Sequence, residues 1–115
     1  MENSKQDLKL MQKRVDNFIS QFEEGYFSPL AMIARLTEEL GELSREVNHY
    51  YGEKPKKDSE KEKLVEEELG DFLFVMMTFA NSLDIDLSEA FDRSMSKIET
   101  RDQNRWTPKD KENES

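Results

Sequence analysis

Two acidic clusters on apolar, helix-forming stretches constrain the fold of this chain more than any other feature. The first reads Glu-Glu-Leu-Gly-Glu and ends at Glu42, and the second reads Glu-Leu-Gly-Asp and ends at Asp71. Apolar residues surround both clusters at the three- and four-residue steps of an α-helix. Residues three apart share one helix face, so Glu39 pairs with Glu42 and Glu68 pairs with Asp71. Each of the two predicted helices therefore presents a pair of carboxylates.

The connection between these helices decides whether the two pairs meet. We expect the first helix to end near Tyr50 and the second to start near Lys61. Glu42 then lies about 12 Å before the end of one helix and Glu68 about 10 Å after the start of the next, at the helical rise. An antiparallel hairpin would place the two pairs opposite each other. The sequence thus predicts a cluster of four carboxylates at one height.

Four carboxylates at a helical interface repel one another and lose hydration, so they need a compensating cation. Glu39, Glu42, Glu68 and Asp71 offer only oxygen ligands, and the chain has no cysteine and a single histidine. Such a set favours Mg²⁺, with Mn²⁺ as the alternative, over zinc. We therefore expect these four residues to bind a divalent cation, which would in turn bind a polyphosphate.

The ordered pair of motifs resembles the MazG-like branch of the all-α nucleotide pyrophosphohydrolase superfamily. Glu-Glu-x-x-Glu is followed, after 25 residues, by Glu-x-x-Asp, and the similarity extends from about Met11 to Trp106. The resemblance implies a Mg²⁺-dependent enzyme that hydrolyses a nucleoside triphosphate to the monophosphate and pyrophosphate, with water attacking the α-phosphorus. It also implies a role in cleansing the cellular nucleotide pool.

Catalytic roles follow from the resemblance and from the residue types. Glu39 and Glu42 are expected to be catalytic as metal ligands. Glu38 is the candidate base for the attacking water or, alternatively, a hydrogen-bonding partner that supports the metal ligands. It points about 100° away from Glu39 around the helix, so a plain surface role also stays open for it. Lys97 and Arg101 lie on one face of the last predicted helix, and we expect them to bind phosphates rather than only to pair with nearby acids.

Further substrate contacts are expected from a polar residue and from aromatic residues. Asn81 follows Asp71 by about 15 Å of helix, which would bring it to a base or sugar; a structural hydrogen bond at the helix end is the alternative. Base recognition is expected to use an aromatic surface. Its candidates are Phe18, Phe22, Tyr26, Phe27 and Trp106. Trp106 would alternatively cover the bundle, and the pattern ranks neither bases nor sugars.

Helical periodicity and capping signals predict an all-α bundle of about four helices. We expect them at about 6–23, 29–50, 60–83 and from 87 onward. Ser28 with Pro29 and Asp86 are expected to start the second and fourth helices, and Ser59 with Glu62 to start the third. Gly25 is a candidate stop for the first helix. The domain would span 1–106, followed by a disordered tail at 107–115.

Apolar stripes on these helices predict which faces are buried, and their extent predicts an oligomer. The stripes comprise Leu8, Met11, Val15, Phe18 and Phe22; Ile33, Leu36, Leu40, Leu43 and Val47; and Ala90, Phe91, Met95 and Ile98. The third helix is apolar almost all round from 69 to 79, so part of it is expected in a subunit interface, with full enclosure within one chain as the alternative. With 37% charged residues, a lone chain has a thin core. We therefore expect a homodimer or homotetramer.

Composition excludes several classes of protein. The net charge of −9 argues against general nucleic-acid binding. The absence of a hydrophobic signal region and of an apolar run of ~20 residues argues against a membrane protein and for a cytoplasmic location. A di-iron bundle is disfavoured, because that class needs Glu-x-x-His motifs and we expect the one histidine, His49, to stand without such a motif. The main alternative to an enzyme is an acidic helical protein that oligomerises and regulates a partner.

Overall fold

The computed structural model describes residues 7–52 and 65–109. This part of the chain contains four helices and no strand, which confirms the all-α class. The helices are α1 (Leu8–Ile19), α2 (Pro29–Tyr51), α3 (Val65–Ser82) and α4 (Leu87–Arg101). Within the same ranges, none of the helices combines the length and hydropathy that a membrane span requires.

Two of the expected caps start their helices as the sequence predicts. The Ser28 hydroxyl accepts a hydrogen bond from the Ala31 N–H at 3.2 Å, and a proline occupies the first turn of α2. At the start of α4, the Asp86 carboxylate accepts from the Ser88 N–H at 2.9 Å. Both bonds satisfy backbone donors that a helix start leaves open. The expected cap at residues 59–62 lies outside the described residues, as does the tail from 110 onward.

The end of α1 differs from the prediction. The apolar spacing extends the helix to about residue 23, whereas α1 ends at Ile19. The chain then turns through i→i−3 bonds, from the Phe22 N–H to the Ile19 carbonyl at 3.1 Å and from the Gly25 N–H to the Phe22 carbonyl at 3.2 Å. Gly25 takes the left-handed conformation with φ of 61°, but it does so within this loop and does not cap the helix. Local turn formation thus overrides the apolar period.

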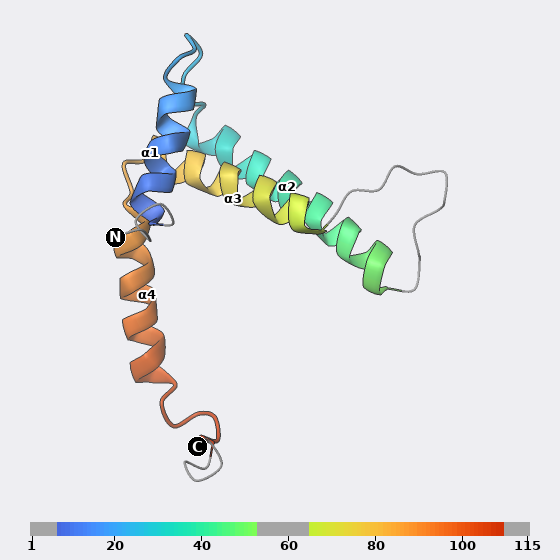
Figure 1. Cartoon of the computed structure of the whole chain (residues 1–115), viewed down its shortest axis with the longest axis vertical. Helices are drawn as coiled ribbons and strands as arrows, with labels where there is room; N and C mark the ends of the chain where they lie inside the picture. The colour runs from blue at the N-terminus through green and yellow to red at the C-terminus, as the bar shows by residue number, and fades with distance from the viewer. Residues whose placement is uncertain (1–6, 53–64, 110–115) are drawn as a thin grey trace.

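The helices form an antiparallel pair with a crossing helix and a projecting one. α2 and α3 lie side by side in opposite directions, α1 crosses the far end of α3, and α4 packs mainly on α1 and leads away from the pair (Figure 1). The radius of gyration is 18.6 Å, whereas a compact domain of this length would have about 13 Å. A single chain is therefore more extended than an ordinary globular domain.

A buried glutamine fixes the direction in which α4 departs. The Gln12 side chain donates to the Asn81 Oδ1 at 2.9 Å and to the Ile85 carbonyl at 2.8 Å, and it accepts from the Leu87 N–H at 2.8 Å. The Asn81 amide donates in turn to the backbone carbonyl of Gln12 at 2.9 Å. These bonds join α1 to the end of α3 and the start of α4. Buried polar groups need such partners, so the contact is costly to break.

The apolar core is small, and several residues that we expected in it are exposed within a single chain. The buried apolar side chains are Met32, Val75, Met77 and Ala80. On α2 the expected seam is largely exposed, with Leu40 51% accessible, because α3 packs on the neighbouring stripe that carries Met32 and the carboxylates. On α4, where Phe91 and Ile98 were expected inside, no residue is buried. The reason is that α4 packs mainly against one other helix, α1, within the described residues.

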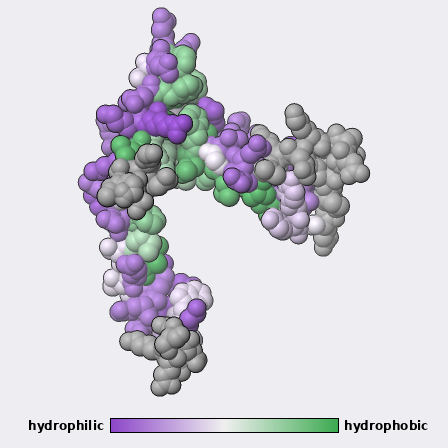
Figure 2. All heavy atoms as spheres, in the orientation of Figure 1, coloured by the Kyte–Doolittle hydropathy of each residue, from purple (hydrophilic) through white to green (hydrophobic). Residues whose placement is uncertain are grey.

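Apolar side chains consequently remain at the surface of the α2–α3 pair and of α4, where Figure 2 shows them as green patches beside polar ones. On α3, Val75 and Met77 are buried whereas Leu69 and Leu73 are exposed. Within the described residues, this helix is therefore only partly covered by α1 and α2. The subunit interface expected there stays a prediction.

Candidate active site

Three carboxylates from α2 and α3 converge at one point of the antiparallel pair. Glu39, Glu42 and Glu68 each offer an oxygen that lies within 4.8 Å of the others. Glu39 and Glu42 meet because residues three apart share a helix face. Glu68 joins them because α3 runs back along α2 (Figure 1). The hairpin thus brings both acidic motifs to the same height.

The three carboxylates differ in exposure: Glu68 is buried, Glu39 is half-buried and Glu42 is exposed. The positive charge of Arg35 offsets only part of the effect of burial and of like charges on Glu39. Glu68 is 1% exposed, and the Oε1 atom of Glu39 is buried without a hydrogen-bond partner among the described residues. Burial raises the pKa of the Glu39 carboxyl above its ordinary value, and repulsion from Glu42, Asp71 and Glu68 raises it further. A carboxylate in this position is costly to ionise unless a cation is bound.

The donor set fits a hard divalent cation. Glu39, Glu42 and Glu68 contribute only oxygen atoms, which Mg²⁺ and Mn²⁺ prefer. The unpartnered oxygen of Glu39 provides a ligand atom that no protein donor occupies within the described part of the chain. The residues are therefore compatible with such an ion.

The other two acidic residues of the predicted site lie at its edge. Asp71 is exposed and is not one of the three convergent carboxylates, although its charge reaches Glu39 and raises the pKa of that carboxyl. Glu38 is exposed and also lies outside the three. The structure thus brings together three of the five acidic residues, with Asp71 close to them.

A buried glutamate that sequence patterns did not single out extends the acidic surface. Glu46 is 5% exposed and lines a pocket of about 230 Å³ with Glu42, Arg45 and Glu68. Its Oε2 atom lies 3.9 Å from the Nδ1 atom of His49. The expectation that His49 lacks a Glu-x-x-His motif is therefore wrong, because Glu46 and His49 form one such pair. A di-iron bundle draws such a pair from each of two helices. Glu46 follows Glu42 by four residues on the same helix, and this spacing was the signal in the sequence that could have placed it beside the cluster.

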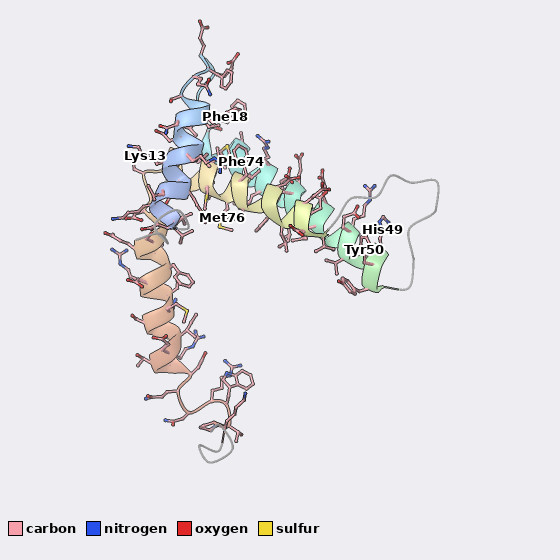
Figure 3. All side chains as sticks on the ribbon, viewed as in Figure 1. Lys13, Phe18, His49, Tyr50, Phe74 and Met76 are labelled. Atoms are coloured by element: carbon pink, nitrogen blue, oxygen red, sulfur yellow. The ribbon has the colours of Figure 1, made fainter. Side chains whose placement is uncertain are left out.

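An aromatic pocket opens where α1 crosses α3. It has a volume of about 330 Å³ and is bounded by Phe18, Phe22, Phe27, Phe74 and Arg35, among others. Figure 3 shows Phe18 of α1 and Phe74 of α3 near this crossing. Three of the five aromatic candidates for base recognition therefore gather in one pocket, to which α2 and α3 also contribute side chains.

Tyr26, the fourth aromatic candidate, is engaged elsewhere. Its hydroxyl donates to the Asp16 Oδ1 at 2.6 Å. Burial and this hydrogen bond raise the pKa of Tyr26 to about 12. The phenol therefore stays protonated, and it ties the loop after α1 back to that helix.

The predicted basic and aromatic contacts near the C-terminus do not reach the carboxylates within one chain. Lys97 and Arg101 are exposed on α4, which leads away from the α2–α3 pair (Figure 1). The Arg101 guanidinium forms two bonds of 3.0 Å to the Asp102 carboxylate, which raises its pKa. Trp106 is 69% exposed, with the Arg105 guanidinium 5.0 Å from its ring.

Asn81 lies at the end of α3, away from the carboxylates and beside α1. Both ends of its amide are bonded to Gln12. It also borders a polar pocket of about 430 Å³ near Lys13 and Asp16. These contacts favour a structural hydrogen-bonding role for Asn81 at the end of α3 over contact with a base or sugar.

Comparisons with known proteins give a consistent result. A model of the MazG nucleotide pyrophosphohydrolase domain matches residues 27–106. The uncharacterized protein YpjD of Bacillus subtilis (strain 168) is 64% identical over 107 residues, which cover 93% of this chain and 96% of YpjD.

Two crystal structures are similar in both sequence and fold. The structure of Bacillus subtilis YpjD, described as a proposed pyrophosphatase, is 67% identical with a TM-score of 0.73, covering 79% of this chain and 93% of that one. A Bacillus-conserved MazG protein, described as a nucleotide pyrophosphohydrolase, is 62% identical with a TM-score of 0.72. The match covers 84% of this chain and 94% of that one.

Proposed function

The chain belongs to the MazG nucleotide pyrophosphohydrolase family, and from this premise we propose that it is a Mg²⁺-dependent hydrolase of nucleoside triphosphates. It would convert a ribo- or deoxyribonucleoside triphosphate to the monophosphate and pyrophosphate and so cleanse the nucleotide pool. Family membership supports the coarser activity, hydrolysis of a pyrophosphate bond in a nucleotide. The observation that carries the proposal is the convergence of Glu39, Glu42 and Glu68 around an unpartnered buried oxygen.

The metal centre would use both acidic motifs. Glu39, Glu42 and Glu68 would hold Mg²⁺, with Mn²⁺ as a substitute, and Asp71 would complete the set after a small movement of its exposed side chain. A bound cation of this kind neutralises charge on the phosphates and lowers the pKa of water. The surrounding protein would contribute a partly buried site, where electrostatic interactions are stronger than in water.

The exposed Glu38 would act as the base. It directly precedes Glu39 and faces solvent, where an attacking water arrives. In the proposed reaction the water oxygen bonds to the α-phosphorus, its proton passes to the Glu38 carboxylate, and the bond from the α-phosphorus to the bridging oxygen breaks. The electron pair of that bond leaves with pyrophosphate.

A second copy of the chain would supply the remaining contacts. Lys97 and Arg101 would bind the departing pyrophosphate, and Trp106 would cover the nucleotide, from α4 of a partner subunit. Two features support this assembly as a homodimer or homotetramer: the basic residues lie on a helix that leads away from the carboxylates of its own chain, and both regions carry exposed apolar side chains. Those side chains are Leu40, Val47, Leu69, Leu73, Phe91 and Ile98.

Phosphorus NMR of the purified protein with a panel of nucleoside triphosphates, in Mg²⁺ and in EDTA, tests the proposal. We expect metal-dependent formation of monophosphate and pyrophosphate, and the relative rates would rank bases and sugars. Orthophosphate with diphosphate would overturn the assigned bond. No reaction across the panel would favour the regulatory alternative.

A further inference from the structure

One arginine of α2 lies between the carboxylate cluster and the aromatic pocket. Arg35 lines the pocket of about 330 Å³ together with Phe18, Phe22 and Phe74. It also precedes Glu39 by one helical turn, and its positive charge acts to lower the pKa of Glu39 against the larger effect of burial. Arg35 therefore borders both parts of the candidate site.

The guanidinium of Arg35 is available to a ligand. Its side chain is exposed, and within residues 7–52 and 65–109 it forms no hydrogen bond or ion pair. Two arginines of α4 differ from it in this respect. Arg93 lies 3.6 Å from the Glu89 carboxylate, and Arg101 lies 3.0 Å from Asp102.

The order of groups along α2 matches the order of groups in a nucleotide. The aromatic pocket comes first, then Arg35, then Glu39 about 6 Å and Glu42 about 10 Å further along the helix axis. A nucleoside triphosphate has the same sequence of an aromatic base, an α-phosphate and outer phosphates. The pocket volume of about 330 Å³ lies at the lower end of the range for small-molecule sites, ~300–1,000 Å³.

We infer that Arg35 binds the α-phosphate of a nucleotide whose nucleoside occupies the aromatic pocket and whose outer phosphates lie at the carboxylate cluster. This inference rests on the proposed function and deepens it by naming a substrate-contacting residue. A planar guanidinium binds two phosphate oxygens at once. It would offset the repulsion between phosphates and four nearby acids, and it would withdraw electrons from the phosphorus that water attacks.

A comparison of nucleosides with their 5′-monophosphates isolates this contact. Isothermal titration calorimetry in EDTA, with the four deoxynucleosides and their monophosphates, measures how much affinity the α-phosphate adds. We expect the wild-type protein to bind the preferred monophosphate about tenfold or more tightly than its nucleoside, as one charge-assisted hydrogen-bonded contact provides. Arg35→Gln should remove this gain and leave nucleoside affinity unchanged, and Arg35→Lys should keep part of it.

Arg93→Gln is the matched control, because it removes the same charge from an exposed helical position on α4. It should keep the full gain from the phosphate. The inference is overturned if wild-type protein gains nothing from the phosphate, if Arg35→Gln retains the gain, or if Arg35→Gln weakens nucleoside and monophosphate equally. The proposed function fails separately, by absence of hydrolysis in the wild-type protein, whereas the calorimetry needs no turnover.

Discussion

The acidic residues of the α2–α3 pair and the basic residues Lys97 and Arg101 of α4 are all candidate site residues, but the fold places the two groups differently. On the pair, carboxylates converge, and Glu68 is fully buried. On α4, the basic residues Lys97 and Arg101 face solvent, and no residue of the helix is buried. One region forms a polar site within a single chain, whereas the other presents its side chains outward.

This difference follows from what each helix packs against. α2 and α3 pack against each other, so carboxylates from both helices are held at close range. α4 packs mainly on α1 (Figure 1), so its apolar side chains Phe91 and Ile98 stay accessible. The same kind of amphipathic pattern therefore produces a partly buried centre in one place and an exposed apolar face in the other. The proposed second copy would unite them.

Removing a carboxylate from the pair should have the largest effect. Glu42→Gln and Asp71→Asn are expected to lower kcat/KM by about a thousandfold or more, because several kcal/mol of transition-state stabilisation depend on the metal. Helical content by circular dichroism should stay largely intact. Glu89→Gln, which removes an exposed acid from α4, is the control and should remain active. Wild-type turnover in either site variant would show that the carboxylates were wrongly assigned.

Mixing two strongly impaired variants would show whether the carboxylates of one subunit meet α4 of another. Glu42→Gln retains the basic face of α4, and a Lys97→Ala/Arg101→Ala double variant retains the carboxylates. In mixed oligomers of a symmetric assembly, one site would receive both intact halves, so activity should return that neither variant shows alone. Activity assays after co-refolding or co-expression measure this. A lasting absence of activity in verified mixed oligomers would argue that each chain acts alone.

Single changes on α4 should have a smaller effect. Arg101→Ala is expected to reduce kcat/KM by about ten- to a hundredfold, the loss typical of one charge-assisted hydrogen-bonded contact. Its ion pair with Asp102 is exposed and contributes little to stability, so the melting temperature should hardly change. Arg93→Ala on the same helix is the control variant, and its kcat/KM should stay close to that of the wild type. Equal activity of both variants would remove Arg101 from the site.

Neutralising Glu39 should have the smallest effect. This effect concerns the free energy of unfolding of the metal-free protein. The pKa of Glu39 is raised from its ordinary 4.5, so the folded protein holds this proton more tightly than the unfolded one. Stability is therefore lost as pH rises above 4.5 through the raised value. Metal-free Glu39→Gln should be about 1 kcal/mol more stable than wild type at pH 7, with no gain at pH 4. Urea unfolding in EDTA checks this, and an equal or larger gain at pH 4 would contradict it.

Local patterns in the sequence predicted elements whose signals lie within a few residues. Ser28 and Asp86 mark helix starts because each side chain bonds a backbone N–H in its own first turn. The spacing of Glu42 and Glu68 from the helix ends predicted their meeting, since an antiparallel pair with a fixed rise leaves one register. The family resemblance followed from the same motifs and is confirmed.

Features that depend on distant contacts were not predictable in this way. The direction of α4 is set by Gln12 and its bonds to Asn81 and Leu87, which no periodic pattern reveals. An apolar stripe indicates that a face is covered but not by which element, so Leu40 and Phe91 were assigned to a core that one chain lacks. Arg35 and Glu46 stand beside the acidic motifs, but their importance appears only once the pockets are known.

The most direct test of the central claim is hydrolysis of a nucleoside triphosphate in oxygen-18 water, followed by mass spectrometry of both products. With Mg²⁺, the account predicts one heavy oxygen in the monophosphate and none in pyrophosphate, and no products in EDTA or with Glu42→Gln. Heavy oxygen in pyrophosphate, or reaction that persists in EDTA, would contradict attack on the α-phosphorus at the carboxylate centre.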